Sequence, residues 1–314
     1  MPPDRRFWST PLAAPRYAVV RLMHAGLRAL VLLPFERQLR IGTRLGAAAR
    51  HLLPKRRRIA ERNIEICLPE LSAEERDALV KRHFESLGAS LAEMAMGWFG
   101  PVEEIRKRVR IEGEEHLRAA VDKGKGVILF SAHFTTLEFC VPVLRPLCPR
   151  LAGMYKPQRN PAMNRVINRG RSRNMDEMFS KDNVRAMMRN LSRNAVVWYA
   201  SDQSYGRKGS VLIPFFNEPA MTNTAICRIA KHSGATVLPY FFRRLPGDAA
   251  YVVDVGAPLD DFPSDDPAED VARLTRLLED YIRLCPEQYW WVHQRFKGRP
   301  APYPDLYEPL QRPA

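Results

Sequence analysis

The sequence lacks the residue patterns of several common kinds of active site. No serine lies in a G-x-S-x-G motif, no phosphate-binding P-loop is present, and no histidines have the spacing of metal ligands. The five cysteines are scattered and form no C-x-x-C pair, which fits reduced thiols in a cytosolic compartment. We therefore expect neither a serine nucleophile nor a metal centre, and we predict no cofactor.

The chain also lacks internal repeats, low-complexity tracts and a cleavable signal pattern. Acidic residues are scarce near its start, because residues 1–62 hold fourteen Lys or Arg but only three Asp or Glu. This segment therefore carries most of the formal net charge of +14. A segment this basic implies an anionic partner, which is either a nucleic acid or a membrane surface.

The apolar segment 17–33 favours a membrane as that partner. Arg21, His24 and Arg28 interrupt it at helical spacing and would form one polar stripe. Charges near the middle of a span are costly, so we predict a helix that lies in the bilayer interface rather than one that crosses it. The alternatives are a core helix with a solvated edge, or a basic nucleic-acid-binding protein, although no nucleic-acid recognition motif is present. Membrane contact is assigned to Arg21, Leu22, Leu27 and Arg28.

The rest of the chain predicts an α/β fold. A capping box at Ser72 and Glu75 opens a helix to about Trp98, which Gly100-Pro101 ends. From about residue 106, β-rich runs alternate with helical patterns, which is typical of a mainly parallel sheet flanked by helices. We therefore expect a membrane-associating segment 1–50 and a main domain 51–314, helical over 51–105 and α/β over 106–314. Strands are predicted at 127–130, 195–200, 211–216, 236–242 and 251–255, and helices at 114–122, 222–232 and 267–284.

His133 and Glu138 are the leading candidates for catalysis. His133 follows the buried strand 127–130, and Glu138 comes five residues later at the start of a helix. A carboxylate can hold an imidazole in one tautomer and stabilise its positive charge, so the pair would serve as a general base. Composition alone predicts about one such pair in a chain like this one, and a buried helix-capping histidine is the alternative. Asp202 follows the strand 195–200 and could orient a base or bind an arginine, or could be a plain turn residue.

Arginines supply the candidate anion-binding groups. The segment 155–174 contains Lys156 and five arginines but no acid, and Arg169-Gly-Arg171 lies in its densest part. Guanidinium groups bind phosphate or carboxylate in a bidentate manner, although a solvated loop would have the same composition. Near the C-terminus we expect Trp290 and Trp291 to pack and Arg295 to contact an anion. The histidines His83, His116 and His232 lie in polar helical stretches and are predicted to be surface residues.

Taken together, these residues resemble the late, lauroyl-type lipid A biosynthesis acyltransferases of the glycerolipid acyltransferase superfamily. The segment His133-Phe-Thr-Thr-Leu-Glu138 matches the H-x-x-x-x-[D/E] motif of that superfamily, with the Glu that the late acyltransferases use. The resemblance runs from about residue 15 to 300. Further matches are Arg62-Asn63-Ile-Glu65, Cys67-Leu-Pro-Glu70, Phe84-Glu-Ser-Leu-Gly88, Gly170-Arg171, Val197-Trp-Tyr-Ala-Ser-Asp202, Tyr205-Gly206, Pro286-Glu-Gln-Tyr289 and His293-Gln-Arg295-Phe-Lys297.

The resemblance implies transfer of a lauroyl-like chain from acyl carrier protein to the 3-hydroxyl of an acyl chain on Kdo2-lipid IVA. His133 would deprotonate that hydroxyl, Glu138 would orient His133, and the attack would be direct, without an acyl-enzyme. Arg171 would stabilise the thioester oxyanion or bind a phosphate, and Asp202 would support the base. Arg169 and Arg295 complete the expected set for binding the anionic substrate.

Family members often carry a transmembrane helix where this chain has Arg21, His24 and Arg28. We therefore expect peripheral or monotopic attachment to the cytoplasmic face of the inner membrane, with acyl carrier protein, the lipid A precursor and anionic lipid as partners. An acyltransferase acting on another glycolipid or a lysophospholipid is the nearest alternative, and a nucleic-acid-binding protein is the alternative from another class.

Overall fold

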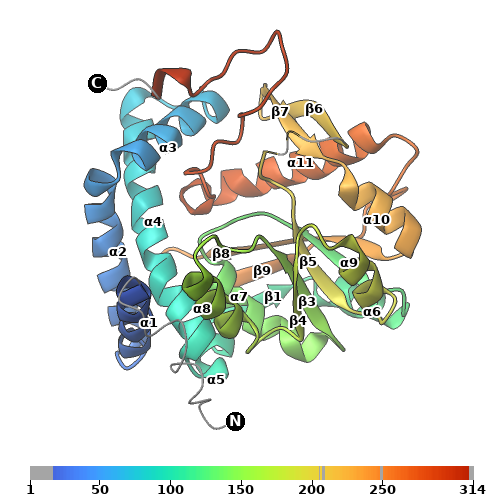
Figure 1. Ribbon diagram of the computed structural model, residues 1–314, viewed down its shortest axis with the longest axis horizontal. Coiled ribbons are helices and arrows are strands. Elements are labelled where there is room, and N and C mark those ends of the chain that lie inside the picture. The colour runs from blue at the N-terminus through green and yellow to red at the C-terminus, as the bar shows by residue number, and fades with distance from the viewer. Residues whose placement is uncertain (1–16, 205, 207–208, 248–249, 311–314) are drawn as a thin grey trace.

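A computed structural model of the chain describes residues 17–204, 206, 209–247 and 250–310. The first sixteen residues of the expected segment 1–50, and Tyr205 of the Tyr205-Gly206 motif, lie outside these ranges. Figure 1 shows helices of the N-terminal third along one flank and a twisted sheet beside them. No helix within the described ranges is long and apolar enough to cross a bilayer.

From residue 17 onward, five helices precede the sheet, as the sequence predicts for residues up to about 105. The longest begins after Ser72, whose side chain and that of Glu75 form the expected capping box, and ends at Gly100. It packs against the second helix through glycines: a Cβ on Gly46 would lie 2.0 Å from the carbonyl oxygen of Phe84. The five are α1 (Ala18–Leu30), α2 (Phe35–Leu52), α3 (Pro54–Cys67), α4 (Ala73–Phe99) and α5 (Val102–Arg106).

The sheet has seven strands in the order β1-β9-β8-β2-β5-β3-β4. Strands β8, β2, β5, β3 and β4 are mutually parallel, whereas β9 pairs antiparallel with β8 and parallel with β1. The mainly parallel sheet flanked by helices is therefore confirmed. The strands are β1 (Val109–Glu112), β2 (Val127–Ser131), β3 (Leu151–Tyr155), β4 (Glu177–Ser180), β5 (Val196–Ala200), β8 (Thr236–Arg244) and β9 (Tyr251–Val255).

Helices connect the parallel strands, because a parallel pair needs a long crossover connection. Three of them, at 114–122, 225–233 and 267–284, match predicted helices closely. The helices are α6 (Glu114–Asp122), α7 (Leu137–Leu144), α8 (Pro161–Arg171), α9 (Val184–Leu191), α10 (Ala225–Ser233) and α11 (Pro267–Leu284), and the 3-10 turns are η4 (Arg145–Leu147), η5 (Pro286–Gln288) and η6 (Glu308–Leu310).

Two features of the fold differ from the sequence prediction. The strand expected at 211–216 exists, but as β6 (Ser210–Phe215) it pairs only with β7 (Glu218–Asn223) in a separate two-stranded antiparallel sheet. The arginine-rich stretch, for which no helix was predicted and a solvated loop was the alternative interpretation, contains the helix α8, which Asn160 caps by accepting hydrogen bonds from the backbone of Ala162 and Met163. The second difference bears on the site, because α8 supplies Arg171.

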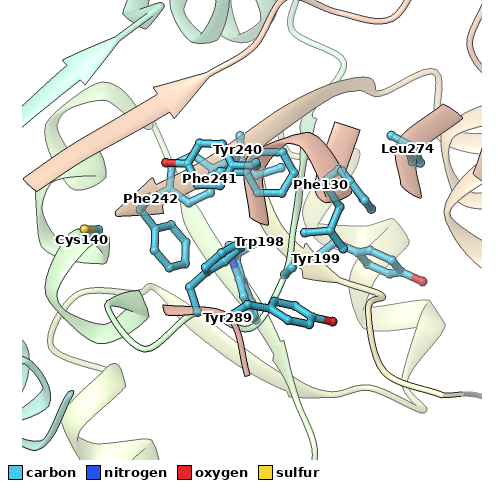
Figure 2. Packing of buried hydrophobic residues seen from close by; sticks show 14 of the residues in the cluster. Phe130, Cys140, Trp198, Tyr199, Tyr240, Phe241, Phe242, Leu274 and Tyr289 are labelled. Carbon is cyan, nitrogen blue, oxygen red and sulfur yellow. The ribbon is translucent and has the colours of Figure 1, made fainter. Parts of the chain in front are cut away.

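The core is rich in aromatic side chains around the carboxyl ends of the central strands. Figure 2 shows Phe130, Trp198, Tyr199, Phe241 and Tyr289 among them. Phe130 and Phe241 meet edge to face with ring centroids 6.0 Å apart. Dense packing of these aromatic side chains fixes the backbone that carries the residues following β2 and β5.

Candidate active site

His133 and Asp202 meet beyond the carboxyl ends of two neighbouring strands. Strands β2 and β5 are parallel and in register, with Ser131 opposite Ala200, so the two residues that follow each strand by two positions also face each other. The ring Nδ1 of His133 lies 2.7 Å from Asp202 Oδ1, and the backbone N–H of His133 donates to Asp202 Oδ2 at 3.1 Å. The prediction that both residues lie at this edge of the sheet is confirmed.

The environment of the pair suits a base and its carboxylate partner. The side chain of Asp202 is 2% exposed, whereas that of His133 is 34% exposed and accessible from solvent. Burial alone would raise the pKa of Asp202, but the charge of His133 and its two hydrogen bonds outweigh burial and hold that pKa below its ordinary value. Asp202 therefore stays ionised, accepts from Nδ1–H, and leaves Nε2 of His133 to take a proton.

Glu138 does not orient the ring of His133, although its spacing in the sequence suggested that role. Among the described residues the carboxylate that hydrogen-bonds the ring of His133 is Asp202, and Glu138 binds Arg171 instead. Glu138 Oε1 accepts from Arg171 Nε at 2.8 Å and Nη2 at 2.5 Å. The reason is local geometry: Glu138 lies in the first turn of α7, past the turn that carries His133, where α8 ends nearby with Arg171.

Trp98 completes the Glu138 cluster. Its indole Nε1–H donates to Glu138 Oε2 at 2.8 Å, so both carboxylate oxygens have partners. The indole also packs on Gly170, where a Cβ would lie 2.3 Å from the ring. The Gly-Arg motif thus needs glycine so that α8 can approach Trp98 and present Arg171. Nothing in the local sequence distinguishes Trp98 from an ordinary core aromatic residue, which is why the pattern did not identify it.

The other two predicted anion-binding arginines have different environments. Arg295 is 4% exposed and donates to the carbonyl of Met221 and to Thr222 Oγ1, so it is bonded to β7 and the expected contact with a substrate anion stays a prediction. Its guanidinium lies over the ring of Phe215, 5.0 Å from the centroid, and its charge helps to lower the pKa of Asp202. Arg169 is exposed near the C-terminal end of α8.

The helix α1 packs differently from the predicted interfacial stripe. His24 is 5% exposed and meets the ring of Phe99 edge to face at 5.3 Å, and Leu27 is also buried, so neither can contact lipid. Leu27 belongs to a small second core, separate from the main one, that α1 shares with Trp98 and with Val166 of α8. Leu22 and Arg28 remain exposed, and Arg21 is partly exposed.

His83 is buried as well, although its polar neighbours predicted a surface position. Its Nδ1 lies 3.0 Å from the carbonyl oxygen of Glu287, which can only accept, so Nδ1 carries the proton. Burial lowers the pKa of His83 to about 4. Trp291 is buried and Trp290 packs partly against the core, as expected.

Comparison with known proteins identifies the enzyme class. Residues 8–298 match the family described as bacterial lipid A biosynthesis acyltransferase. The chain is 36% identical over 301 residues to the lipid A biosynthesis lauroyltransferase of Escherichia coli K12, covering 96% of this chain and 98% of the relative. It is 36% identical to the palmitoleoyltransferase of the same organism, over 93% and 95% of the two chains, and 28% identical to its myristoyltransferase, over 91% and 88%.

The match covers the described site and the helices on which it rests, and it includes both strands that carry His133 and Asp202. This chain belongs to the bacterial lipid A biosynthesis acyltransferases.

Proposed function

We propose that the protein transfers a lauroyl-like chain from acyl carrier protein to the 3-hydroxyl of an acyl chain on Kdo2-lipid IVA. The observation that carries the proposal is the His133–Asp202 pair at the carboxyl ends of β2 and β5 in a chain of this family. The relatives in E. coli are named for lauroyl and palmitoleoyl transfer, and the identity to both is 36%. Both chain lengths therefore belong in the first assay.

The reaction would proceed by direct attack. Nε2 of His133 takes the proton of the acceptor hydroxyl as its oxygen attacks the thioester carbonyl, and Asp202 stabilises the imidazolium that forms. Collapse of the tetrahedral intermediate breaks the C–S bond, and the imidazolium returns its proton to the leaving thiolate. All five cysteines are buried, and burial raises the pKa of Cys148 and Cys227 to about 12, so none offers an accessible thiolate for a covalent intermediate.

Arg171 is the best-placed group for negative charge in this reaction. Two of its five N–H groups bind Glu138, and within the described part of the chain the other three have no hydrogen-bond partner. Glu138 and Trp98 hold the guanidinium in one orientation, which reduces the entropy lost when it binds an anion. We assign Arg171 to the thioester oxyanion or a substrate phosphate, and Glu138 to positioning Arg171.

Binding to anionic lipid on the cytoplasmic face of the inner membrane would use α1 and α2. Most of the exposed large hydrophobic side chains of the described residues lie between Val19 and Leu53. On α2, Ile41, Leu45 and Leu52 share one exposed stripe, with three arginines beside it. Apolar side chains among arginines are typical of a surface that sits in the headgroup region of a bilayer. The arginines are Arg37, Arg40 and Arg44.

The test is a transfer assay with purified protein. Kdo2-lipid IVA is incubated with acyl carrier protein loaded with chains of 12, 14 or 16 carbons, and the mass of the lipid product is measured by mass spectrometry. We expect the mass of one acyl group to be added, and we expect His133→Ala to abolish the gain. His232→Ala removes an exposed histidine of α10 and is the matched control. An unchanged precursor with every donor contradicts the proposal, and transfer to a lysophospholipid alone supports the alternative substrate.

A further inference from the structure

An ion pair between a fully buried carboxylate and a largely buried arginine lies near the turn 133–136, outside the catalytic groups described above. The side chain of Glu93 on α4 is 0% exposed and is bonded to Arg244, the last residue of β8, and the hydroxyl of Tyr251 donates to the same oxygen, Glu93 Oε1, at 2.9 Å. Burial alone would lower the pKa of Arg244, but the charge of Glu93 raises it, so the guanidinium stays charged. A buried pair of this kind is poor evidence for stability, because apolar side chains of the same volume often stabilise as well.

The pair connects to the catalytic turn through two hydroxyl groups. Arg244 Nη2 donates to Ser86 Oγ at 2.8 Å, and Ser86 Oγ lies 2.8 Å from Thr135 Oγ1. An arginine can only donate, so Ser86 accepts from it, and the single proton of Ser86 is available for Thr135. Thr135 follows His133 by two residues. The guanidinium of Arg244 therefore begins a short hydrogen-bond chain that ends on this turn.

The backbone of Arg244 reaches the same turn by a second route. Its N–H donates to Gln288 Oε1 at 2.7 Å, and Gln288 Nε2 donates back to its carbonyl at 2.8 Å. The carbonyl of Gln288 accepts from the backbone N–H of Thr135 at 2.9 Å, and the N–H of Trp290 donates to the carbonyl of His133 at 3.1 Å. The carbonyl of His133 and the backbone N–H of Thr135 thus bond to the segment 288–290, and Gln288 ties that segment to the backbone of Arg244.

We infer that Arg244 and Glu93, acting through Ser86 and Thr135, are positioning residues that fix the turn carrying the general base. The inference rests on the proposed function, because it takes His133 as that base. Neither residue touches the reacting atoms. Their effect is to hold the His133 backbone so that Nδ1 stays aligned with Asp202 and Nε2 faces the acceptor hydroxyl. Small displacements of these atoms would lower the reaction rate considerably.

Ser86→Ala and Thr135→Val test the chain without breaking the ion pair. We expect each to lower kcat about tenfold while KM changes less than about twofold, because ground-state binding is untouched. The double variant should lose no more than either single one, since both changes remove the same connection. Ser90→Ala is the matched control: this hydroxyl lies one turn further along α4 and donates only to the carbonyl of Leu87. Thermal melting shows which variants are folded.

A spectroscopic readout separates this inference from the transfer reaction itself. The ¹⁵N chemical shifts of the His133 ring, assigned from the missing signals of His133→Ala, report which nitrogen carries the proton. We expect one Nδ1–H tautomer in the wild type and a mixed, broadened signal in Ser86→Ala and Arg244→Met. Unchanged kcat and unchanged ring signals in Ser86→Ala and Thr135→Val overturn the inference, even if Arg244→Met does not fold. If the wild type transfers no acyl chain, the proposed reaction fails, and the ring signals alone then decide whether the turn is positioned in this way.

Discussion

Asp202 accepts two hydrogen bonds from His133, one from the ring Nδ1 and one from the backbone N–H, with one carboxylate oxygen for each. A carboxylate held in this way cannot rotate toward another partner without losing both bonds. It fixes the ring orientation and the tautomer together. Because the two residues follow paired strands in register, the geometry depends on β2 and β5 and not on the sequence between His133 and Glu138.

Asp202→Asn should therefore remove most of the activity while leaving the protein folded. The amide keeps the shape of the carboxylate but not the charge that stabilises the imidazolium, and the comparable change in a serine protease lowers kcat by about 10⁴-fold. We expect a loss of at least about 10³-fold in kcat with little change in KM. Single-turnover transfer of a labelled acyl chain measures it. Asp265→Asn is the control, because Asp265 is an exposed residue paired only with Lys231. A loss below about tenfold would exclude Asp202 as the partner of the base.

Glu138→Gln and Arg171→Met should each lower transfer by about 10²-fold, and together they should cost little more than Arg171→Met alone. The side chains are 16% and 22% exposed and share two hydrogen bonds, so removing either one leaves the other misplaced. A double-mutant cycle on kcat/KM measures the coupling. Glu138→Gln combined with Asp202→Asn provides the comparison, since those residues belong to separate pairs. Additive losses for Glu138 and Arg171 would show that Glu138 does not act through Arg171.

Gly170→Ala should reduce activity through Trp98. The added Cβ would lie 2.3 Å from the indole, so Trp98 or the end of α8 must move, and both hold the Glu138–Arg171 pair. We expect a loss of about tenfold or more in kcat and a lower melting temperature, as for other cases of overpacking. Gly26→Ala in α1 has no atom within 4 Å of the new Cβ and should be neutral or slightly stabilising. Equal behaviour of the two alanine variants would contradict the prediction.

The parts of the fold that were predictable from sequence are those with strong local signals. The apolar runs around Val127 and Val196 are rich in β-branched and aromatic residues, and they are β2 and β5. Strand β3 and the edge strand β4 were missed because Leu151–Tyr155 contains Ala and Gly and Glu177–Ser180 contains Glu, which have low β-propensity. They form strands because β3 pairs with β5, and β4 in turn pairs with β3.

The site was predictable in its residues but not in its pairings. His133 follows a strand, and so does Asp202, yet 69 positions separate them and only the register of β2 and β5 brings them together. Glu138 is close to His133 in sequence, and that closeness suggested a contact which the start of α7 prevents. Arg171 was singled out for its charge, but its partner is 33 positions away. Local spacing identifies chemical groups, whereas long-range pairing decides which group orients which.

Leu22→Ser combined with Leu45→Ser should weaken binding to anionic vesicles by about tenfold or more, because each change removes apolar area from the proposed lipid-facing surface. Sedimentation with phosphatidylglycerol vesicles measures the partition. Arg21→Gln with Arg28→Gln should weaken it to a similar degree, and should also reduce its dependence on salt. Leu284→Ser is the control, since this leucine is 66% exposed but lies on α11. Equal binding of all variants would place the membrane contact elsewhere.

His83 should make the folded state less stable in mild acid. Burial, partly offset by the carbonyl of Glu287, lowers its pKa to about 4, whereas the unfolded chain has the ordinary value of about 6.5. Between these values the unfolded state binds a proton that the folded state does not, so the free energy of unfolding falls as the pH falls from about 6.5 toward 4. The contribution of this one residue amounts to about 2 kcal/mol between pH 7 and pH 5.

His83→Asn removes the titrating group and keeps a donor for the carbonyl of Glu287. Urea unfolding at pH 7 and pH 5 measures the free energy of unfolding of both proteins. The variant should be less stable than the wild type at pH 7, because asparagine fills less of the site, but the difference should shrink by about 2 kcal/mol at pH 5. His232→Asn on the exposed side of α10 should leave the pH dependence unchanged. A parallel loss in wild type and His83→Asn would mean that His83 does not remain neutral in the folded protein, and that the acid sensitivity arises from other groups.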